Sequence, residues 1–341
     1  MPSDAAGAWE RFAAGATGVI VLDDAAAEAQ VRPALHGRGL RVLVTSRRTL
    51  AGLESVERLT LGRLPREDSV AFLRSAIPEQ QRTDEDVVAL AELCGDLPLA
   101  LRIAAGRVAS QPARRAGDLV RRLRRSPRRL QLLTAGDLEV ERAFAASYVQ
   151  LSAAQAGLFR DLAVQPPRSF SAAAAAAAHA LGEDEALDLL EELVDLGLVE
   201  PLDHGRFRLH DLLRLYAAER LQEEDPEAAD HTRTIDRWYL GTAARAGDLF
   251  APDDATAWTG VGVPLVPFPS RAAAGAWLRT EVDGWFSALR RLADDGRHHE
   301  LLAVAENINR FADFSLDLGR WVDFYSLTAA SGSSSCSRSA A

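Results

Sequence analysis

The segment Val19-Ile20-Val21-Leu22-Asp23-Asp24 decides the fold of the first part of this chain. A short, β-branched apolar run that ends in polar residues is typical of a buried parallel strand. A second run, Arg41-Val42-Leu43-Val44-Thr45, has the same pattern, and the alanine-rich residues between the two runs favour a helix. A shorter third strand is predicted at 58–61. The order strand, helix, strand predicts part of a parallel α/β sheet.

Helical periodicity replaces the strand pattern from Arg66 onward. Val70, Leu73 and Ile77 recur at helical spacing, and the segment up to about residue 133 predicts a small helical bundle. The next part predicts helices at 139–150, 155–164, 171–181 and 184–196, strands at 198–201 and 206–209, and a helix at 211–221. Three helices followed by a β-hairpin are typical of a winged helix.

The C-terminal part predicts a linker followed by helices. Residues 260–269 are rich in glycine and proline and indicate the linker. After it, Trp277, Trp285 and Leu289 lie at helical spacing, and a second helix follows, so we expect one helical hairpin at the start of a repeat array. Residues 331–341 are a serine-rich, low-complexity stretch, which predicts a disordered tail.

Composition narrows the class of protein. The chain has 341 residues, 48% of them hydrophobic, which suits a folded protein of roughly two or three domains. Its formal charge of −10 gives no general attraction for nucleic acid or an anionic membrane. Two cysteines, Cys94 and Cys336, do not suggest a disulfide framework or a metal site. The sequence shows no signal peptide and no apolar stretch that could span a bilayer, so we expect a cytoplasmic protein.

Polar side chains that suit nucleotide chemistry follow both predicted strands. Asp23 and Asp24 end the first strand, where a carboxylate on rigid backbone can bind Mg²⁺ beside phosphates. Thr45 and Arg47 follow the second strand, and the Arg47 guanidinium can bind a terminal phosphate through two nitrogens. Parallel strands present their carboxyl ends at one edge of a sheet, so these side chains should lie together. Taken singly, each also fits an ordinary strand end.

Two further motifs lie outside the predicted sheet. Residues 95–100 are Gly-Asp-Leu-Pro-Leu-Ala and predict a turn into a helix, with Pro98 in its first turn. His210 and Asp211 follow the second hairpin strand. His210 can donate a hydrogen bond to a phosphate, and Asp211 can cap the next helix. A helix boundary and a structural histidine are the simpler explanations when each motif is considered alone.

Together and in this order, the motifs resemble those of the NB-ARC class of STAND nucleotide switches, in the form found in AfsR/SARP-type actinobacterial transcriptional regulators. Residues 19–24 resemble the Walker B strand and residues 42–47 the sensor strand. Residues 95–100 resemble the GLPLA motif, and residues 209–211 the MHD motif, with Leu209 in place of methionine. The resemblance covers the chain from about residue 17 to about residue 325.

The resemblance implies roles for individual residues. Asp23 would take part in Mg²⁺ binding, and Arg47 would sense the terminal phosphate. Asp24 and Thr45 would belong to the same nucleotide-binding set. Pro98 would pack near adenine. His210 would contact the β-phosphate of bound ADP and hold the closed state. Exchange of ADP for ATP would then move the winged-helix part, under the control of a helical-repeat sensor.

The chain departs from the family in one respect. All 39 basic residues are arginine, so there is no GxxxxGK[ST] loop, whose lysine and backbone donors bind phosphates. We therefore expect a truncated chain that lacks the P-loop and the N-terminal effector domain. Such a chain should bind ADP or ATP weakly or not at all and should not be an enzyme. Intact relatives are implied to be slow ATPases that use ADP or ATP with Mg²⁺.

The expected fold class is a partial parallel α/β sheet, a remnant of a P-loop NTPase fold, followed by mainly helical domains. The expected domains are a partial nucleotide-binding α/β subdomain with the Walker B and sensor strands (1–64), a helical ARC1-like subdomain (65–135), a winged-helix ARC2-like subdomain (136–235), a linker with a TPR-like helical start (236–330) and the disordered tail (331–341).

The expected function is that of an NB-ARC/STAND-type signalling regulator module associated with transcriptional regulation. Two alternatives stay open: a nucleotide-independent module that binds proteins through its helical surfaces, and a winged-helix DNA-binding protein. The candidate reading helix at 183–196 opposes DNA binding, because it carries many acidic residues and no arginine. Protein partners are therefore expected rather than DNA or membrane.

One dense basic patch could meet nucleic acid or an acidic partner. A solvated helix face is the simpler explanation, because no aromatic residue is interleaved with the arginines. The patch consists of Arg114, Arg115, Arg121, Arg122, Arg124, Arg125, Arg128 and Arg129.

Overall fold

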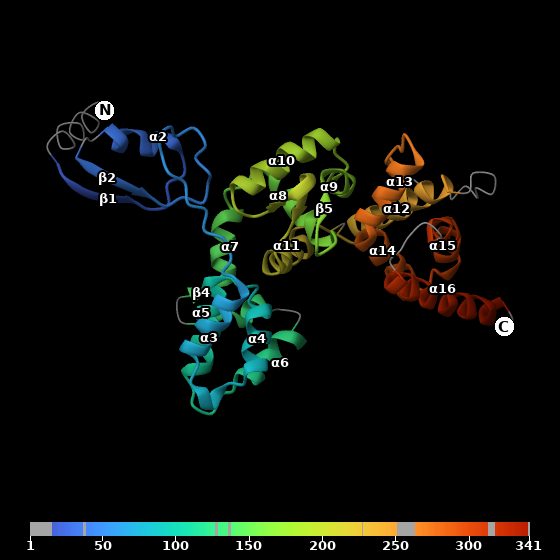
Figure 1. Cartoon of the computed structure of the whole chain (residues 1–341), viewed down its shortest axis with the longest axis horizontal. Helices are drawn as coiled ribbons and strands as arrows, with labels where there is room; N and C mark the ends of the chain where they lie inside the picture. Colours follow the sequence, from blue (N-terminus) through green and yellow to red (C-terminus); the bar gives the residue numbers. More distant parts are fainter. Residues whose placement is uncertain are drawn as a thin grey trace. The chain divides into compact units, whose positions relative to one another are not determined.

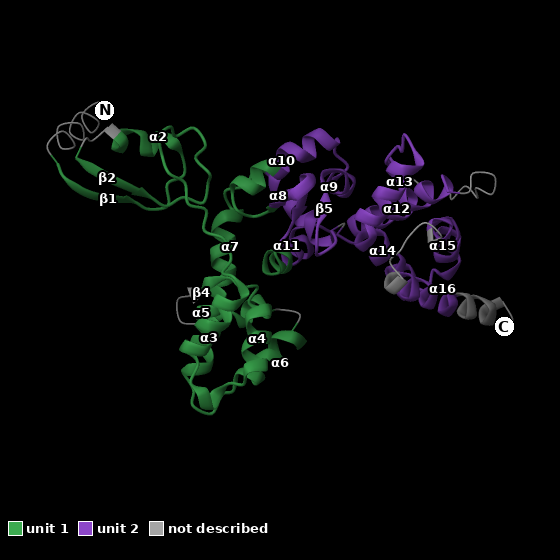
Figure 2. Ribbon diagram, in the orientation of Figure 1, with its two compact units in different colours: residues 1–152, 191–200, 210–216 green, residues 153–190, 201–209, 217–341 purple. Residues whose placement is uncertain are grey.

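The structure is a computed structural model that describes residues 16–36, 39–126, 129–135, 138–226, 228–250, 263–312 and 318–339. The chain forms two units, shown in green and purple in Figure 2. Unit 1 comprises residues 1–152, 191–200 and 210–216, and unit 2 comprises residues 153–190, 201–209 and 217–341. None of the helices in the described ranges has the length and apolar character needed to cross a membrane.

Unit 1 begins with a small parallel sheet. Strands β1 (Gly18–Leu22) and β2 (Leu40–Val44) pair in parallel, with Leu22 opposite Val44. Helix α2 (Glu28–Val31) and a 3₁₀ turn connect them and lie along the sheet (Figure 1). A small core forms beneath the strands, because Leu22 and Val44 pack on a buried cluster of apolar residues: Ala25, Val31, Leu50 and Leu53. The prediction of two parallel strands joined by a helical segment is confirmed.

The prediction that these strands are buried is wrong. Val19 is 66% exposed, Val21 58% and Leu43 57%. Within the described residues β1 and β2 pair only with each other, so one face rests on the small core and the other faces solvent. The third strand predicted at 58–61 does not form either, and Leu59 and Leu61 there are exposed.

The next part of unit 1 is the helical bundle that the sequence predicts. It contains α3 (Arg66–Ala76), α4 (Asp84–Leu93), α5 (Pro98–Ala109) and α6 (Ala116–Arg125). Their apolar stripes form one core in which Leu73, Leu90 and Leu101 are fully buried. The Nε2 of buried Gln81 shares its two N–H groups among the carbonyls of three residues in and after α5: Val108, Gln111 and Arg114. These contacts satisfy carbonyls in the last turn of α5 and in the loop after it.

Short strands β3 (Thr134–Ala135) and β4 (Leu138–Glu139) form an antiparallel pair and lead into α7 (Val140–Tyr148). Helices α8 (Ala153–Asp161), α9 (Ala172–His179), α10 (Glu183–Asp195) and α11 (Asp211–Glu224) follow. Strands β5 (Phe170–Ser171), β6 (Glu200–Leu202) and β7 (Arg206–Arg208) form a sheet in the order β5-β7-β6. The helices and the hairpin predicted over 139–221 are thus confirmed, with boundary shifts of a few residues. The division between the two units passes through α10 and α11.

Among the residues that the structure describes, unit 2 ends in five helices: α12 (Ala228–Asp248), α13 (Arg271–Thr280), α14 (Val282–Asp294), α15 (His298–Ala312) and α16 (Leu318–Ser339). Helix α12 packs against α9, α13, α14 and α15. It approaches α15 closely at Gly247, where an added β-carbon would lie 2.1 Å from the carbonyl oxygen of Asn307. Small residues at such a crossing allow the helix backbones to touch.

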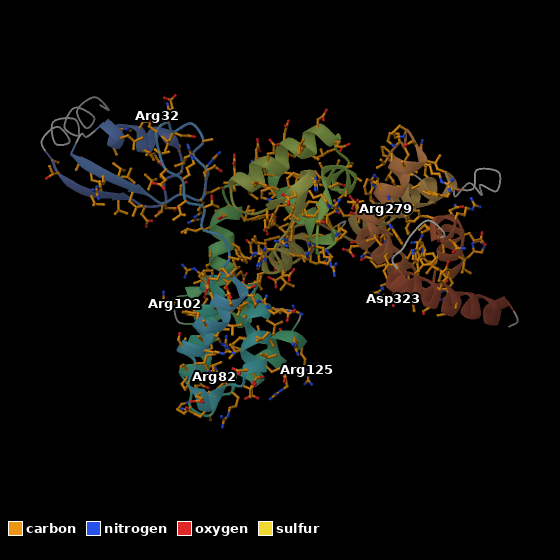
Figure 3. All side chains as sticks on the ribbon, viewed as in Figure 1. Arg32, Arg82, Arg102, Arg125, Arg279 and Asp323 are labelled. Carbon is orange, nitrogen blue, oxygen red and sulfur yellow. The ribbon has the colours of Figure 1, made fainter. Side chains whose placement is uncertain are left out.

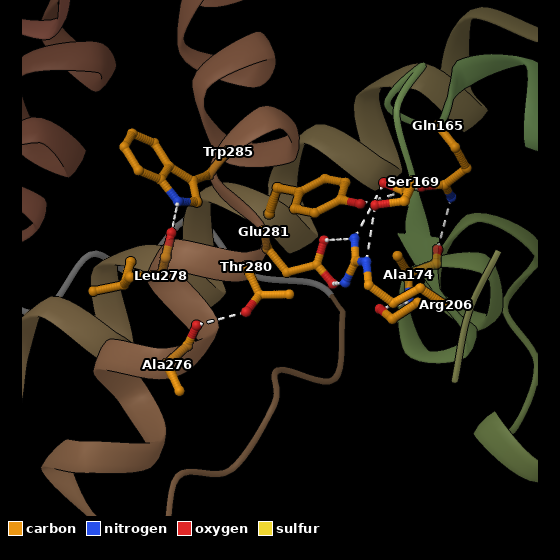
Figure 4. Close-up of polar contacts among 11 residues, drawn as sticks. Gln165, Ser169, Ala174, Arg206, Ala276, Leu278, Thr280, Glu281 and Trp285 are labelled. Carbon is orange, nitrogen blue, oxygen red and sulfur yellow. Dashed lines mark hydrogen bonds and ion pairs between the residues drawn. The ribbon is translucent and has the colours of Figure 1, made fainter. Parts of the chain in front are cut away.

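A buried ion pair ties strand β7 to the turn between α13 and α14 (Figure 4). Arg206 donates to both carboxylate oxygens of Glu281, at 2.7 Å and 3.1 Å. It also donates to the hydroxyl and the carbonyl of Ser169. Glu281 is 3% exposed, so its carboxylate is shielded from water while it is paired through both oxygens with this guanidinium.

Two predictions about the C-terminal part have different outcomes. The predicted linker has neither helix nor strand over 263–269, while 260–262 lie outside the described residues. The tail predicted to be disordered is instead helical up to Ser339, because it continues α16, whose Trp321, Phe324 and Ser331 are buried. The five-domain division as a whole stays a prediction.

Candidate functional site

The strand-end cluster consists of Asp23, Asp24, Thr45 and Arg47, which follow β1 and β2 at the same edge of the sheet. The Thr45 hydroxyl donates a short hydrogen bond to the Asp23 carboxylate and accepts the backbone N–H of Asp24 at 2.9 Å. Asp24 has a φ of 54°, a left-handed conformation that turns the chain out of the strand. The sequence prediction that these side chains lie together is borne out by these contacts.

Arg47 crosses the same edge and pairs with Asp24. Its Nε lies 3.1 Å from Oδ1 and its Nη2 lies 3.2 Å from Oδ2, which is a two-point contact. Both side chains are partly exposed, at 37% and 58%, so solvent screens the pair. The edge therefore offers carboxylate oxygens, which Mg²⁺ prefers, next to a guanidinium that suits a phosphate.

The junction cluster consists of Gly95, Asp96, Pro98 and His210. His210 donates its Nε2–H to the carbonyl oxygen of Gly95 at 2.7 Å, and its Nδ1 accepts the backbone N–H of Leu212 at 3.2 Å. One ring nitrogen is thus a donor and the other an acceptor. A neutral imidazole with its proton on Nε2 satisfies both contacts.

The backbone of residues 94–98 explains why this junction forms. Helix α4 ends at Leu93, and Gly95 and Asp96 follow with φ values of 60° and 58°. A β-carbon on Gly95 would lie 2.1 Å from Cε1 of His210, so only glycine leaves room for the ring. Pro98 then begins α5 at a position where a missing N–H costs nothing.

Arg66 holds the other side of the junction. Its Nε lies 2.9 Å from Oδ1 of Asp96 and its Nη2 lies 2.7 Å from Oδ2, and Asp96 is 8% exposed. The backbone N–H of Leu64 also donates to the Asp96 carbonyl at 3.0 Å. Arg66 was not among the site residues predicted from the sequence. The sequence did offer one signal. Gly95 and Asp96 follow a predicted helix, and this pair indicates a left-handed turn whose aspartate needs a hydrogen-bond or ion-pair partner.

Burial sets the electrostatics of His210. Desolvation, the largest effect, lowers the pKa of His210 below the ordinary value of 6.5, and the hydrogen bond to Gly95 opposes this only in part. Arg63 also lowers the pKa of His210. These effects favour the neutral ring, in agreement with the hydrogen-bond pattern.

The six site residues predicted from sequence thus fall into two groups. Asp23, Asp24, Thr45 and Arg47 form one group, and Pro98 and His210 belong to the other. Among the described residues, no hydrogen bond or ion pair joins one group to the other. The prediction that one nucleotide contacts both groups stays a prediction. A shallow surface depression beside Arg66 is lined by Pro65, Arg66, Glu67, Val70 and Arg74, and by none of these six.

The arginine patch lies around α6, apart from Arg128, which is outside the described residues. Arg121 pairs with Asp118 one turn earlier, while Arg125 is exposed at the end of the helix (Figure 3). Burial, followed by Arg114 and Arg122, lowers the pKa of Arg107 beneath this surface. Whether the patch meets an acidic partner stays a prediction.

Two regulatory proteins are similar to most of this chain. "Regulatory protein AfsR" of Streptomyces griseus is 37% identical over 286 residues, which is 82% of this chain and 29% of that protein. "Regulatory protein AfsR" of Streptomyces coelicolor is 36% identical over 290 residues, with the same coverage of 82% and 29%. The chain therefore spans less than a third of the length of the curated relatives it matches.

No family model matches the chain. A solved STAND protein with a tetratricopeptide repeat sensor, PH0952 from Pyrococcus horikoshii, aligns with 96% of this chain and 48% of its own, at 16% identity and a TM-score of 0.30. Over 82% of its length, the chain is similar to a part of the AfsR regulatory proteins.

Proposed function

We propose that this chain is an NB-ARC/STAND-type signalling regulator module, associated with transcriptional regulation and acting in the cytoplasm. The similarity to the AfsR proteins supports the regulatory role. The nucleotide-dependent part of the proposal depends on the strand-end and junction clusters. In this proposal, ADP or ATP with Mg²⁺ binds against both clusters in one of two conformations of the protein.

The observation that carries the proposal is the hydrogen bond from His210 to Gly95. It joins the segment that resembles the MHD motif to the segment that resembles the GLPLA motif, across 115 residues of sequence. A single ring that bridges two segments is a contact that a bound ligand can make or break. We propose that this contact belongs to the closed conformation of the switch.

We further propose that the chain alone binds nucleotide weakly and does not turn over ATP. Its 39 basic residues are all arginine, so the chain has no lysine for a phosphate-binding loop. Within the two clusters, phosphate binding would depend on Arg47, His210 and backbone N–H groups. A lysine within a loop of backbone donors supplies most of the phosphate contacts in P-loop sites. Arg47 is also engaged by Asp24, and a phosphate would have to compete with that carboxylate.

We propose that the helices and hairpin over 153–209 form a winged helix that acts as a moving element rather than a DNA reader. Acidic residues line the exposed side of α10, where a reading helix would need positive charge. They are Glu183, Asp184, Glu185, Asp188, Glu191, Glu192 and Asp195. An electrophoretic shift assay should therefore detect no DNA complex at moderate salt.

Hydrogen exchange with added ADP and Mg²⁺ tests the nucleotide proposal. We expect a dissociation constant weaker than ~100 μM, with slower exchange at residues 22–25, 45–47 and 210–214. The Arg47→Gln variant should weaken binding further, while Arg102→Gln, an exposed arginine on α5, should not (Figure 3). Micromolar affinity would contradict weak binding. No protection at either cluster under saturating ADP would contradict the site itself.

A nucleotide-independent interaction module is the second candidate, favoured by one exposed helix surface. On α16, Val322 is 64% exposed and Tyr325 is 47% exposed, one helical turn apart. Adjacent exposed apolar side chains suit a protein contact. If this candidate is right, a Val322→Asp variant should lose partner binding in a pull-down whether or not ADP is present.

A further inference from the structure

Helix α6, in the helical bundle of unit 1, has two sides of opposite character. Its apolar side packs on α4 and α5, and Leu119 and Leu123 are buried there. Its other side exposes four arginines to solvent: Arg121, Arg122, Arg124 and Arg125. These four residues are the centre of the arginine patch, which lies outside the strand-end and junction clusters.

Positive charge strongly exceeds negative charge in this part of the chain. Residues 107–129 contain nine arginines and one acidic residue, Asp118, although the whole chain has a formal charge of −10. One oxygen of Asp118 pairs with Arg121, and the other accepts the backbone N–H of Arg115 at 3.3 Å. Three exposed arginines of α6 contact no carboxylate of a described residue: Arg122, Arg124 and Arg125.

The same charges repel one another beneath the surface. Arg107 is half-buried and donates to the carbonyl oxygens of Leu132 and Thr134, at 2.6 Å and 3.3 Å. Burial lowers the pKa of Arg107, and the charges of Arg114 and Arg122 lower it further. A negative charge bound at this surface would relieve that repulsion.

Helix stability does not explain the whole patch. Arginines in the last turn of a helix complement the negative partial charge of its carbonyl end, and this accounts for Arg122 and Arg125 in part. Arg115, however, is the exposed N-cap residue of α6, where a positive charge opposes the helix dipole. Charge along the entire helix therefore suits a bound anion better than it suits the bundle alone.

A shallow surface depression at the end of α6 adds an apolar contact. The residues that line it are Asp118, Arg121, Arg122, Arg125, Ser126 and Leu132. Leu132 is partly exposed, so a ligand there meets guanidinium groups together with one aliphatic side chain. Guanidinium groups bind carboxylates through two parallel hydrogen bonds, and Arg125 extends from the end of the helix into solvent (Figure 3).

We propose that the arginine patch on α6 is a docking surface for an acidic peptide segment of a partner protein. Arg122 and Arg125 bind carboxylates on successive turns of the peptide, and an apolar side chain of the peptide packs on Leu132. The proposal goes beyond the nucleotide switch and does not depend on nucleotide binding.

Nucleic acid fits this surface less well than a peptide does. Residues 107–129 contain no aromatic residue on which bases could stack. Phosphates prefer the amino end of a helix, whereas Arg122 and Arg125 lie at the carboxyl end of α6. A long polyanion would also meet the rest of a chain whose net charge is −10, while a short peptide meets only the charges within about 10 Å.

Fluorescence anisotropy with the 341-residue chain tests this proposal. The probe is a labelled helical peptide of about 12 residues, with glutamates on one face and leucines on the other. We expect a dissociation constant of about 10–100 μM at low ionic strength and a loss of about tenfold or more in affinity at high salt. Arg122→Gln and Arg125→Gln should each weaken binding about two- to fivefold, as exposed ion pairs do.

Two matched controls make the test specific. Arg102→Gln changes an exposed arginine on α5 of the same bundle and should leave the affinity unchanged within about twofold. A peptide with glutamine in place of every glutamate should not bind. An equal loss in Arg102→Gln, or no binding of the acidic peptide by a folded chain, would overturn the proposal.

Two further measurements separate the other possible occupants. A duplex DNA of random sequence that binds more tightly than the peptide, and is lost in the same two variants, would make nucleic acid the ligand. Sedimentation of the chain alone tests a second copy, whose acidic helix α10 would be the occupant. Self-association that the combined Arg122→Gln and Arg125→Gln substitutions abolish would assign the surface to that second copy. Either result would overturn the proposal, and a chain that binds the peptide alone supports it.

Discussion

His210 contacts Gly95 across 115 residues of sequence, with its Nε2–H donated to the Gly95 carbonyl at 2.7 Å. The contact requires glycine at one end, because of the space the ring fills, while burial and the N–H that Leu212 donates to Nδ1 favour a neutral ring at the other. Backbone geometry, side-chain packing and protonation therefore all act on the same junction. Each can be changed separately by mutation or by pH.

Replacing Gly95 by alanine should destabilise the protein strongly. The new β-carbon would clash with the His210 ring at 2.1 Å, and the residue would keep a φ of 60°. The left-handed backbone costs about 1–2 kcal/mol and overpacking about 1–3 kcal/mol. Urea unfolding should show a loss of about 2 kcal/mol or more. Gly106→Ala is the matched control, because nothing lies within 4 Å of its β-carbon. It should be about 0.5–1 kcal/mol more stable than wild type.

Acid should weaken the junction through His210. The pKa of this ring is lowered from 6.5 by burial, so the unfolded chain takes up its proton at a higher pH than the folded protein does. The contribution of the neutral ring is complete above pH 6.5 and is lost as the pH falls through the folded pKa. His210→Gln keeps a donor and cannot titrate. Urea unfolding at several pH values should show a smaller acid loss in this variant, and an unchanged loss would contradict the assignment.

Breaking the buried pair between Arg206 and Glu281 should cost far more than breaking a surface pair. Arg206→Met leaves the Glu281 carboxylate, which is 3% exposed, without its guanidinium. The expected loss is about 3–5 kcal/mol in thermal or urea unfolding. Arg233→Met removes an exposed ion pair with Asp230 and should change stability by no more than about 0.5 kcal/mol. Similar losses in both variants would mean that the Arg206 pair is not the anchor described here.

Cys94 should not react with thiol reagents in the folded protein. Burial raises the pKa of the Cys94 thiol to about 12, with a smaller contribution from Asp96. Thiolate, the reactive form, is therefore nearly absent at neutral pH, and the side chain is also out of reach. Alkylation followed by peptide mapping should find no label at Cys94 until urea unfolds the chain. Rapid native labelling at Cys94 would show that the end of α4 opens readily.

Most helices and strands of this fold can be predicted from the spacing of apolar residues within each segment. Period-three and period-four apolar residues such as Val70 and Leu73 predict their helices, and β-branched runs predict β1 and β2. The contact of Asp23 with Thr45 follows from the parallel pairing, because both residues follow paired strand ends. These predictions need only the spacing of residues along one or two adjacent segments.

Contacts between distant segments were not predictable in the same way. Every residue of Val19–Leu22 is apolar, so the sequence does not say which face the core covers, and Val19 and Val21 turned out exposed. The ion pair between Arg66 and Asp96 depends on how distant segments meet in space. The same holds for the hydrogen bond of His179 to Asp161 and for the contact of His231 with Asp225. Arginine and aspartate are common on surfaces, and nothing local marks these particular ones as buried partners.

The open face of the β1–β2 sheet has a practical consequence for handling the protein. Val19, Val21 and Leu43 together offer solvent a strip of aliphatic surface, next to strand edges that pair with nothing else among the described residues. Two molecules can cover this strip by packing face to face, and their unpaired strand edges can add strands from one copy to the next. We expect the protein to self-associate as its concentration rises. A Val21→Thr variant keeps a residue that favours strands and reduces the exposed apolar surface. Light scattering should find this variant monodisperse at concentrations where the wild type self-associates.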